Sequence, residues 1–301
     1  MSTTTLRAIF ASALVGTLAA CGGSDDSPAL PPPPPPAPAP IDPLAHQRSV
    51  AFAEAPLAFN EMAAASVFFG TDEAVKVLAT GDICSTGTAA VALDGAAAAV
   101  GTQLPTGNHV FTGTFSGCRT IFDSTLTGNS TYAYSAPNTI LTNITATATA
   151  SAMRRLATTS AGEAVDWTGS GSGVYTFNET TANGESQYAA TFTPANGATL
   201  INNANGSVLT FVSGELRESS AVNISSGAFL RYSVEYHALT ISVGGSTIVF
   251  DGAVTQTFGA NNTIVPSGEA QMRVAGAMAA RIVYNTQGKL VADVSAAVPV
   301  W

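Results

Sequence analysis

Charged residues are scarce in this chain of 301 residues, and positively charged ones are the scarcest. Only 10% of the residues are Asp, Glu, Lys or Arg, and 20 acidic residues outnumber 11 basic ones, which leaves a net charge of −9. A protein that binds nucleic acid or an anionic lipid surface needs clustered positive charge. The composition therefore excludes nucleic acid as a partner, and the abundance of Thr, Ser, Val and Gly favours strands and turns.

Histidine is also rare, and the sequence lacks the common catalytic motifs. The three histidines are His46, His109 and His237, and no Gly-x-Ser-x-Gly elbow supplies a serine nucleophile for them. The glycine-rich stretch 169–173 has its serines out of register for that elbow and fails the dinucleotide-binding pattern as well. We therefore expect a protein that is not an enzyme, with no catalytic residues, no metal site and no cofactor. A hydrolase with an unrecognised site is the alternative.

Glu235 and His237 come nearest to a chemical site, because they share one face of a predicted strand. Two ligands do not make a zinc site, so we interpret the pair as part of a solvated polar face. Asp251 and Asp293 lie among apolar residues and are interpreted as surface carboxylates.

Long apolar runs are missing, apart from a short one at the start of the chain. It leads through small residues to Leu18-Ala19-Ala20-Cys21 and is too short to span a bilayer as a helix. The segment resembles the lipobox of bacterial lipoproteins, in which the signal peptide is cut before a cysteine that then carries lipid. The resemblance implies a signal peptide at residues 1–20 and a lipid anchor on Cys21. A secretory signal with a chance cysteine is the alternative.

The residues after Cys21 bear on where the anchor sits. In enterobacteria, Asp directly after the lipidated cysteine favours the inner membrane; this chain has Gly22, so the resemblance points to the outer membrane, with the protein facing the periplasm or the cell surface. Residues 21–43 form a linker with an unbroken proline run at 31–36, which favours polyproline II. At about 3.1 Å per residue the linker reaches about 70 Å from the lipid.

Cys84 and Cys118 are the remaining cysteines, 34 residues apart. A pair of cysteines in an exported protein indicates a disulfide, and closing this loop stabilises the fold by about 4 kcal/mol in the chain-entropy model. A metal site and a catalytic thiol are the competing interpretations. Neither cysteine has a Cys or His neighbour at ligand spacing.

Residues 44–82 are predicted to form short helices that pack on the following domain. Asp42-Pro43 is typical of a helix start, and Pro56 is expected to interrupt that helix. A second helix is expected at 57–69 and a third at 71–81, each with an apolar stripe too wide to be left exposed.

From residue 83 to the C-terminus the apolar residues alternate, which predicts an antiparallel β domain. At 229–237 the alternation predicts that Tyr232, Val234 and Tyr236 are buried while Arg231, Glu235 and His237 are exposed. Gly244-Gly245 predicts a two-residue hairpin turn. The fold class is mainly β, a curved antiparallel meander sheet or a partly closed barrel. Strands are expected at 90–93, 109–116, 124–134, 139–150, 165–177, 186–193, 229–237, 239–243, 248–258 and 290–294, with one long apolar face at 272–284.

Residues 84–134 resemble a group of uncharacterised exported bacterial proteins with a Cys…Cys strand pair. The resemblance implies the disulfide and the β fold, and it implies nothing catalytic. It rests on Cys84-Ser85-Thr86-Gly87-Thr88, Pro105-Thr106-Gly107-Asn108, Gly117-Cys118 and Thr125-Leu126-Thr127-Gly128.

These features predict a lipoprotein of the outer membrane whose β domain binds a partner or scaffolds the envelope without catalysis. The expected partners are the membrane, through the N-terminal lipid, and an envelope protein or an apolar ligand. A periplasmic carrier of an apolar or lipid ligand is the main alternative, and it requires an open apolar cavity where a scaffold has a filled core. A membrane-spanning barrel, suggested by the final Trp301, is disfavoured by Pro299. The residues expected to line a carrier cavity are Tyr232, Tyr236, Phe250, Phe258, Met272 and Met278.

Overall fold

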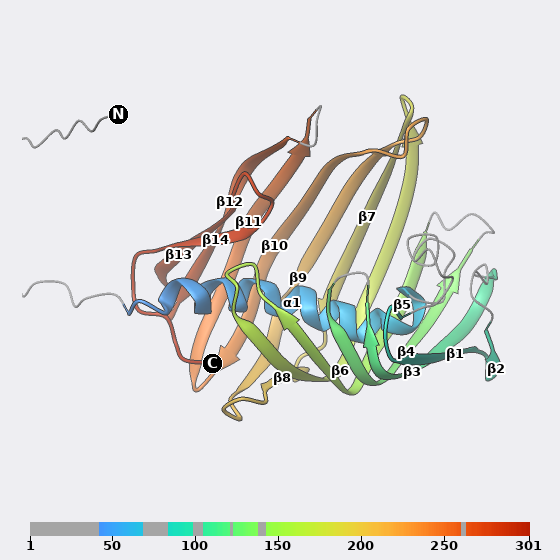
Figure 1. The fold of residues 1–301 in the computed structure, drawn as a ribbon, viewed down its shortest axis with the longest axis horizontal. Helices are drawn as coiled ribbons and strands as arrows, with labels where there is room; N and C mark the ends of the chain where they lie inside the picture. Colours follow the sequence, from blue (N-terminus) through green and yellow to red (C-terminus); the bar gives the residue numbers. More distant parts are fainter. Residues whose placement is uncertain (1–41, 69–83, 99–104, 121–122, 138–142, 260–262) are drawn as a thin grey trace, which may run out of the picture. The chain divides into compact units, whose positions relative to one another are not determined.

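A computed structural model of the chain describes residues 42–68, 84–98, 105–120, 123–137, 143–259 and 263–301. Cys21, the signal peptide, nearly all of the linker and the helix expected at 71–81 lie outside the described residues. The described part of the chain consists of one helix near its start and a β-sheet (Figure 1).

The sheet is antiparallel throughout and contains 14 strands, which confirms the predicted fold class. Strands that follow one another in the sequence mostly lie side by side, so the sheet is an open meander that curves around the helix (Figure 1). Only β8 departs from the single path, since it pairs with β6 and β9. The strands are β1 (Thr88–Leu93), β2 (Ala96–Ala97), β3 (Gly107–Arg119), β4 (Thr125–Ala136), β5 (Ile144–Thr158), β6 (Ala164–Ala182), β7 (Glu185–Pro194), β8 (Thr199–Asn202), β9 (Val208–Asn223), β10 (Phe229–Val243), β11 (Ser246–Phe258), β12 (Ile264–Val274), β13 (Ala277–Tyr284) and β14 (Leu290–Val294).

Tight two-residue turns join several of these strands. The predicted turn at Gly244-Gly245 is confirmed, with φ angles of 53° and 80°, because a type I′ hairpin needs positive φ at both positions. A second such turn, Ala275-Gly276, separates β12 from β13. The interpretation of 272–284 as one continuous face missed it, because Ala275 carries no turn signal of its own and adopts a φ of 49° that glycine would adopt more easily.

The facing of β10 follows the alternation predicted from its sequence. Val234 and Tyr236 are fully buried, whereas Tyr232, which was expected to be buried, is only partly buried. On the opposite face Arg231 is exposed, and Glu235 and His237 are partly exposed. A shift of register after Tyr236 then places Leu239 in the core, because a β-bulge inserts one extra residue and moves the buried set to odd numbers.

One continuous helix, α1 (Ala45–Phe68), replaces the two helices expected before residue 70. The prediction that Pro56 interrupts the helix was wrong. A proline inside a helix costs about 3 kcal/mol, but α1 lies against the concave face and is buried on nearly every side. The Tyr236 hydroxyl also donates a hydrogen bond of 2.8 Å to the Ala53 carbonyl, three residues before Pro56. This bond connects β10 to the helix close to the proline. No helix in the described part of the chain is both long and apolar enough to cross a membrane.

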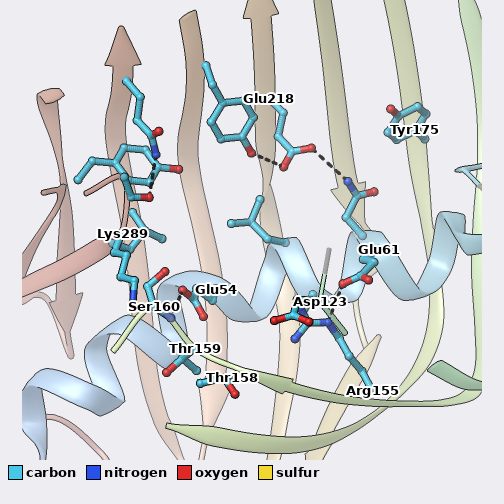
Figure 2. A pocket seen from close by; sticks show the side chains of 18 residues that line it. Glu54, Glu61, Asp123, Arg155, Thr158, Thr159, Ser160, Tyr175, Glu218 and Lys289 are labelled. Atoms are coloured by element: carbon cyan, nitrogen blue, oxygen red, sulfur yellow. Dashed lines mark hydrogen bonds and ion pairs between the residues drawn. The ribbon is translucent and has the colours of Figure 1, made fainter. Parts of the chain in front are cut away.

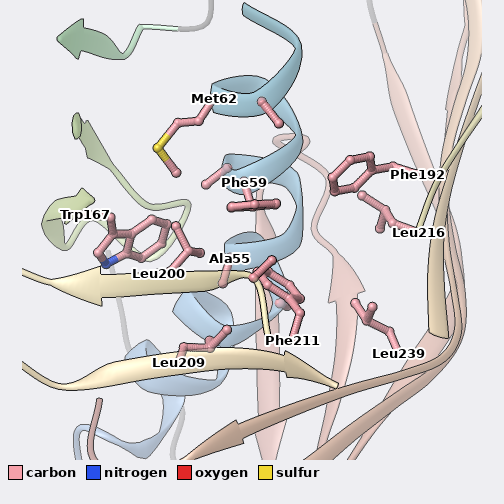
Figure 3. Close-up of a cluster of buried hydrophobic side chains, with 14 of the residues drawn as sticks. Ala55, Phe59, Met62, Trp167, Phe192, Leu200, Leu209, Phe211, Leu216 and Leu239 are labelled. Carbon is pink, nitrogen blue, oxygen red and sulfur yellow. The ribbon is translucent and has the colours of Figure 1, made fainter. Parts of the chain in front are cut away.

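The core lies between α1 and the sheet (Figure 3). Phe59 packs against Phe192 and Phe211, with ring centroids 5.9 and 5.0 Å away. Met62 packs over Gly169, where a Cβ would come within 2.8 Å of the methionine methyl group. The glycine-rich stretch in β6 therefore allows a close approach between helix and strand, which is a packing role.

The disulfide ties the first strands together. Cys84 precedes β1, Cys118 lies in β3, and their sulfurs are 2.09 Å apart. The Cα atoms are separated by 5.0 Å, within the usual range for a disulfide, because β1 pairs with β3 along its length.

Candidate functional site

A cavity of about 860 Å³ lies between α1 and the concave face of the sheet (Figure 2). This volume falls within the usual range of small-molecule sites. The helix contributes Glu54, Ala58 and Glu61 to the wall, at the i, i+4 and i+7 positions that place side chains on one helix face. At about 1.5 Å of rise per residue, the two glutamates are separated by about 10 Å along the helix axis.

Five polar side chains from separate strands form the opposite wall of this pocket. They are Tyr175 of β6, Glu218 of β9, Tyr232 of β10, Gln256 of β11 and Tyr284 of β13. Directly paired residues share a face of a sheet, and Glu218 pairs with the buried residue opposite it on β10 while Tyr232 pairs with Gln256. The strand alternation thus turns these polar groups inward.

Glu218 is held at the sheet side of the pocket by two donors. The Tyr232 hydroxyl donates to Oε1 at 3.1 Å, and the Asn60 Nδ2 lies 3.5 Å from Oε2 (Figure 2). The carboxylate keeps some exposure toward the pocket, but it is enclosed deeply enough that burial raises the pKa of Glu218, against the opposing effect of the Tyr232 hydrogen bond.

Asn60 leaves a polar atom unsatisfied in the same place. The residue is only 3% exposed, and its Oδ1 finds no hydrogen-bond donor among the described residues. A buried acceptor without a donor costs about 1–3 kcal/mol. Asn60 belongs to the pocket lining, so a ligand donor that reached Oδ1 would remove this cost.

Glu54 is a second carboxylate without a cation in ion-pair contact in the described structure. Its Oε1 accepts a hydrogen bond of 2.8 Å from the Ser160 backbone N–H. Burial raises the pKa of Glu54, and the hydrogen bonds from Ser160 oppose this shift.

Glu61, by contrast, is neutralised within the wall. The Arg155 guanidinium lies 2.6 Å from its Oε2, and both side chains are largely buried. The hydroxyls of Thr120 and Ser124 donate to its other oxygen. Glu61 and Arg155 both line the pocket, and the Arg155 guanidinium is already paired with Glu61.

No family model, curated protein or solved structure matches this chain.

The six residues expected to line an apolar cavity occupy different environments. Tyr232 lines the pocket. Tyr236, Phe250 and Met272 are fully buried in the core, and Phe258 and Met278 are half-buried outside the pocket lining.

The histidines and the isolated acidic residues lie elsewhere in the fold. His237 Nε2 lies 2.6 Å from Glu235 Oε1 on the convex face, and the pair has no third ligand, since no group of three or more His, Cys, Asp or Glu gathers in the described ranges. Asp251 and Asp293 are exposed, as interpreted from the sequence.

His109 forms a contact that the sequence did not reveal. Its Nδ1 lies 2.6 Å from Asp94 Oδ2, and its Nε2 lies 2.9 Å from the Thr106 carbonyl. The Asp94 carboxylate and that carbonyl raise the pKa of His109. When both ring nitrogens donate in this way, neither is free to act as a general base.

Sequence reasoning missed Glu54, Asn60 and Glu218. A signal for Glu218 was present, because it lies two residues after the buried Leu216 in β9 and so faces the core. Polar residues on a core-facing stripe indicate a buried polar site. β9 was absent from the predicted strands, so this signal could not be used.

Proposed function

We propose that this protein is a lipid-anchored, non-enzymatic binding protein of the bacterial cell envelope, and that its ligand site is the pocket between α1 and the concave sheet. The observation that carries the proposal is the unsatisfied Asn60 Oδ1 beside Glu218 in a cavity of about 860 Å³. Buried polar groups are nearly always hydrogen-bonded in native proteins. A ligand with matching donors would remove the cost of leaving these groups unpaired.

The lining of the pocket supports binding over the alternative functions. The described residues that line it include neither histidine nor cysteine, so the lining holds neither a cysteine nucleophile nor a serine activated by histidine. An apolar carrier is supported less, because four carboxylates line the pocket: Glu54, Glu61, Asp123 and Glu218. A purely scaffolding domain would have no need of this polar cavity.

The location in the envelope rests on the lipobox resemblance at Cys21. Two or more acyl chains hold a protein stably to a membrane, whereas one holds it only marginally. The linker would then place the binding domain away from the lipid surface.

Cys21→Ala is expected to release the protein from membranes, because the lipid attachment site is lost. Fractionation of cells that express the variant should move the chain from the membrane to the soluble fraction. Ser24→Ala, three residues along the linker, serves as the control and should stay membrane-bound. A Cys21→Ala protein that remains in the membrane fraction would show that the anchor is elsewhere.

Leu57→Trp is expected to prevent ligand binding in the pocket. Leu57 lies partly exposed in the pocket wall, and the larger indole ring would occupy the space of the ligand. Mass spectrometry of small molecules released from the mature protein, purified from its own membranes in detergent, should show a bound compound that falls about tenfold in the variant. Leu156→Trp is the matched control, since Leu156 is 40% exposed and outside the pocket lining. Equal ligand content in all three proteins would contradict a ligand site in this pocket.

A further inference from the structure

We propose that the pocket selects a ligand that carries a protonated primary or secondary amine, whose N–H groups bind Glu218 and Asn60. This inference rests on the proposed function and specifies the chemistry of its ligand. Three features of the pocket support it: a carboxylate without a cation, an acceptor without a donor, and aromatic rings around both.

Glu218 lacks a positive partner in the described part of the chain. Its contacts are the Tyr232 hydroxyl and the Asn60 amide, both neutral. Arg155 is bonded to Glu61, and Lys289 lines the pocket with an exposed side chain. A buried carboxylate is stabilised most by a cation that also donates hydrogen bonds, and here the ligand would have to supply it.

Asn60 narrows the ligand chemistry further. Its Nδ2 faces the Glu218 carboxylate, so its Oδ1 is the atom left over, and this atom can only accept. A carboxylate or phosphate ligand would bring acceptors to an acceptor and a negative charge to Glu218. A quaternary ammonium would bring charge without N–H donors, whereas an ammonium group supplies both.

Tyr175, Tyr232 and Tyr284 suit a cation as well. Burial raises the pKa of all three phenols, so they stay neutral at ordinary pH, and the face of a neutral aromatic ring carries negative partial charge. A cation near such a face gains about 0.5–2 kcal/mol. A metal ion suits the site less, because a cavity of this size would leave it mostly surrounded by water and no cluster of three ligating residues is described here.

The test measures binding of defined probes to the mature protein in detergent by isothermal titration calorimetry. Three amines of increasing size are used: pentylamine, tyramine and spermidine. They are compared with 4-ethylphenol, which is tyramine without its amino group, and with choline, 3-(4-hydroxyphenyl)propanoate and calcium chloride. At least one amine should bind, and tyramine should bind about tenfold or more tightly than 4-ethylphenol. Binding should weaken as the pH falls through the pKa of Glu218.

Glu218→Gln should weaken amine binding by about tenfold or more while raising the melting temperature of the ligand-free protein, because a costly buried carboxylate becomes neutral. The rise in melting temperature separates lost binding from lost folding. Glu215→Gln is the matched control on the same strand: Glu215 pairs with Arg217 and is outside the pocket lining, so its amine affinity should be unchanged.

The possible outcomes separate this inference from the proposed function. If no amine binds, or if Glu218→Gln binds amines as the wild type does, the amine inference is overturned. If 4-ethylphenol, choline, the propanoate or calcium binds better than every amine and Leu57→Trp abolishes that binding, the pocket is a ligand site for another chemistry. If no probe binds and no compound is released from the purified protein, both proposals fail.

Discussion

Val234→Asp should lower the free energy of unfolding by about 3–5 kcal/mol, the cost of an uncompensated charge in a protein interior. Val234 is fully buried in the middle of β10, between β9 and β11. An aspartate there is either ionised without a partner, or it stays protonated because burial raises its pKa. Both states destabilise the fold. Urea unfolding followed by circular dichroism measures the change.

The neighbouring residue provides the control for this prediction. Glu235 lies on the opposite face, half-exposed and paired with His237, and exposed ion pairs contribute little. Glu235→Ala should therefore change stability by about 0.5 kcal/mol. If the two substitutions are equally damaging, β10 does not face the core as described.

Arg155→Met should cost about 2–4 kcal/mol, because it leaves the buried Glu61 without its cation. The loss of stability is expected to be smaller than for most broken buried ion pairs, because Thr120 and Ser124 still donate hydrogen bonds to the Glu61 carboxylate. Thermal and urea unfolding at neutral pH should both report the loss.

Arg154→Met is the matched control, one residue away in the same strand. Arg154 pairs with Asp166 at 2.6 Å, but its side chain is 53% exposed, so the substitution should cost about 1 kcal/mol or less. The double variant Glu61→Leu with Arg155→Met should recover much of the loss, because removing both charges leaves neither unpaired. Equal effects of the two arginine substitutions would mean that the Glu61 pair does not stabilise the fold.

The two unpaired pocket carboxylates carry a stability cost that fits a binding role. Because burial raises the pKa of Glu54 and Glu218, the folded state holds their protons more tightly than the unfolded state does. The contribution of the two protonated carboxyl groups to folding stability is fully present below their ordinary pKa of 4.5. It is lost as the pH rises through the raised pKa that each group has in the folded protein. At neutral pH these side chains therefore destabilise the empty protein, and a bound cation would offset that cost.

The sequence by itself determined the class of the fold and much of its local detail. Alternation along β10 predicted which residues face the core, and Gly244-Gly245 predicted its turn into β11, because both signals depend only on neighbouring residues. The presence of two cysteines in a chain expected to be exported predicted the contact between Cys84 and Cys118.

Only the tertiary structure decided the path of α1 and the existence of the pocket. Local rules end a helix at Pro56, but burial of α1 on nearly every side outweighs that cost, and burial of this kind depends on the whole sheet. The pocket depends on contacts such as that between Asn60 and Glu218, which are 158 residues apart. Patterns of neighbouring residues carry no information about a contact over that sequence separation. The contact between these two polar groups therefore follows only from the tertiary structure, in which the sheet curves around the helix.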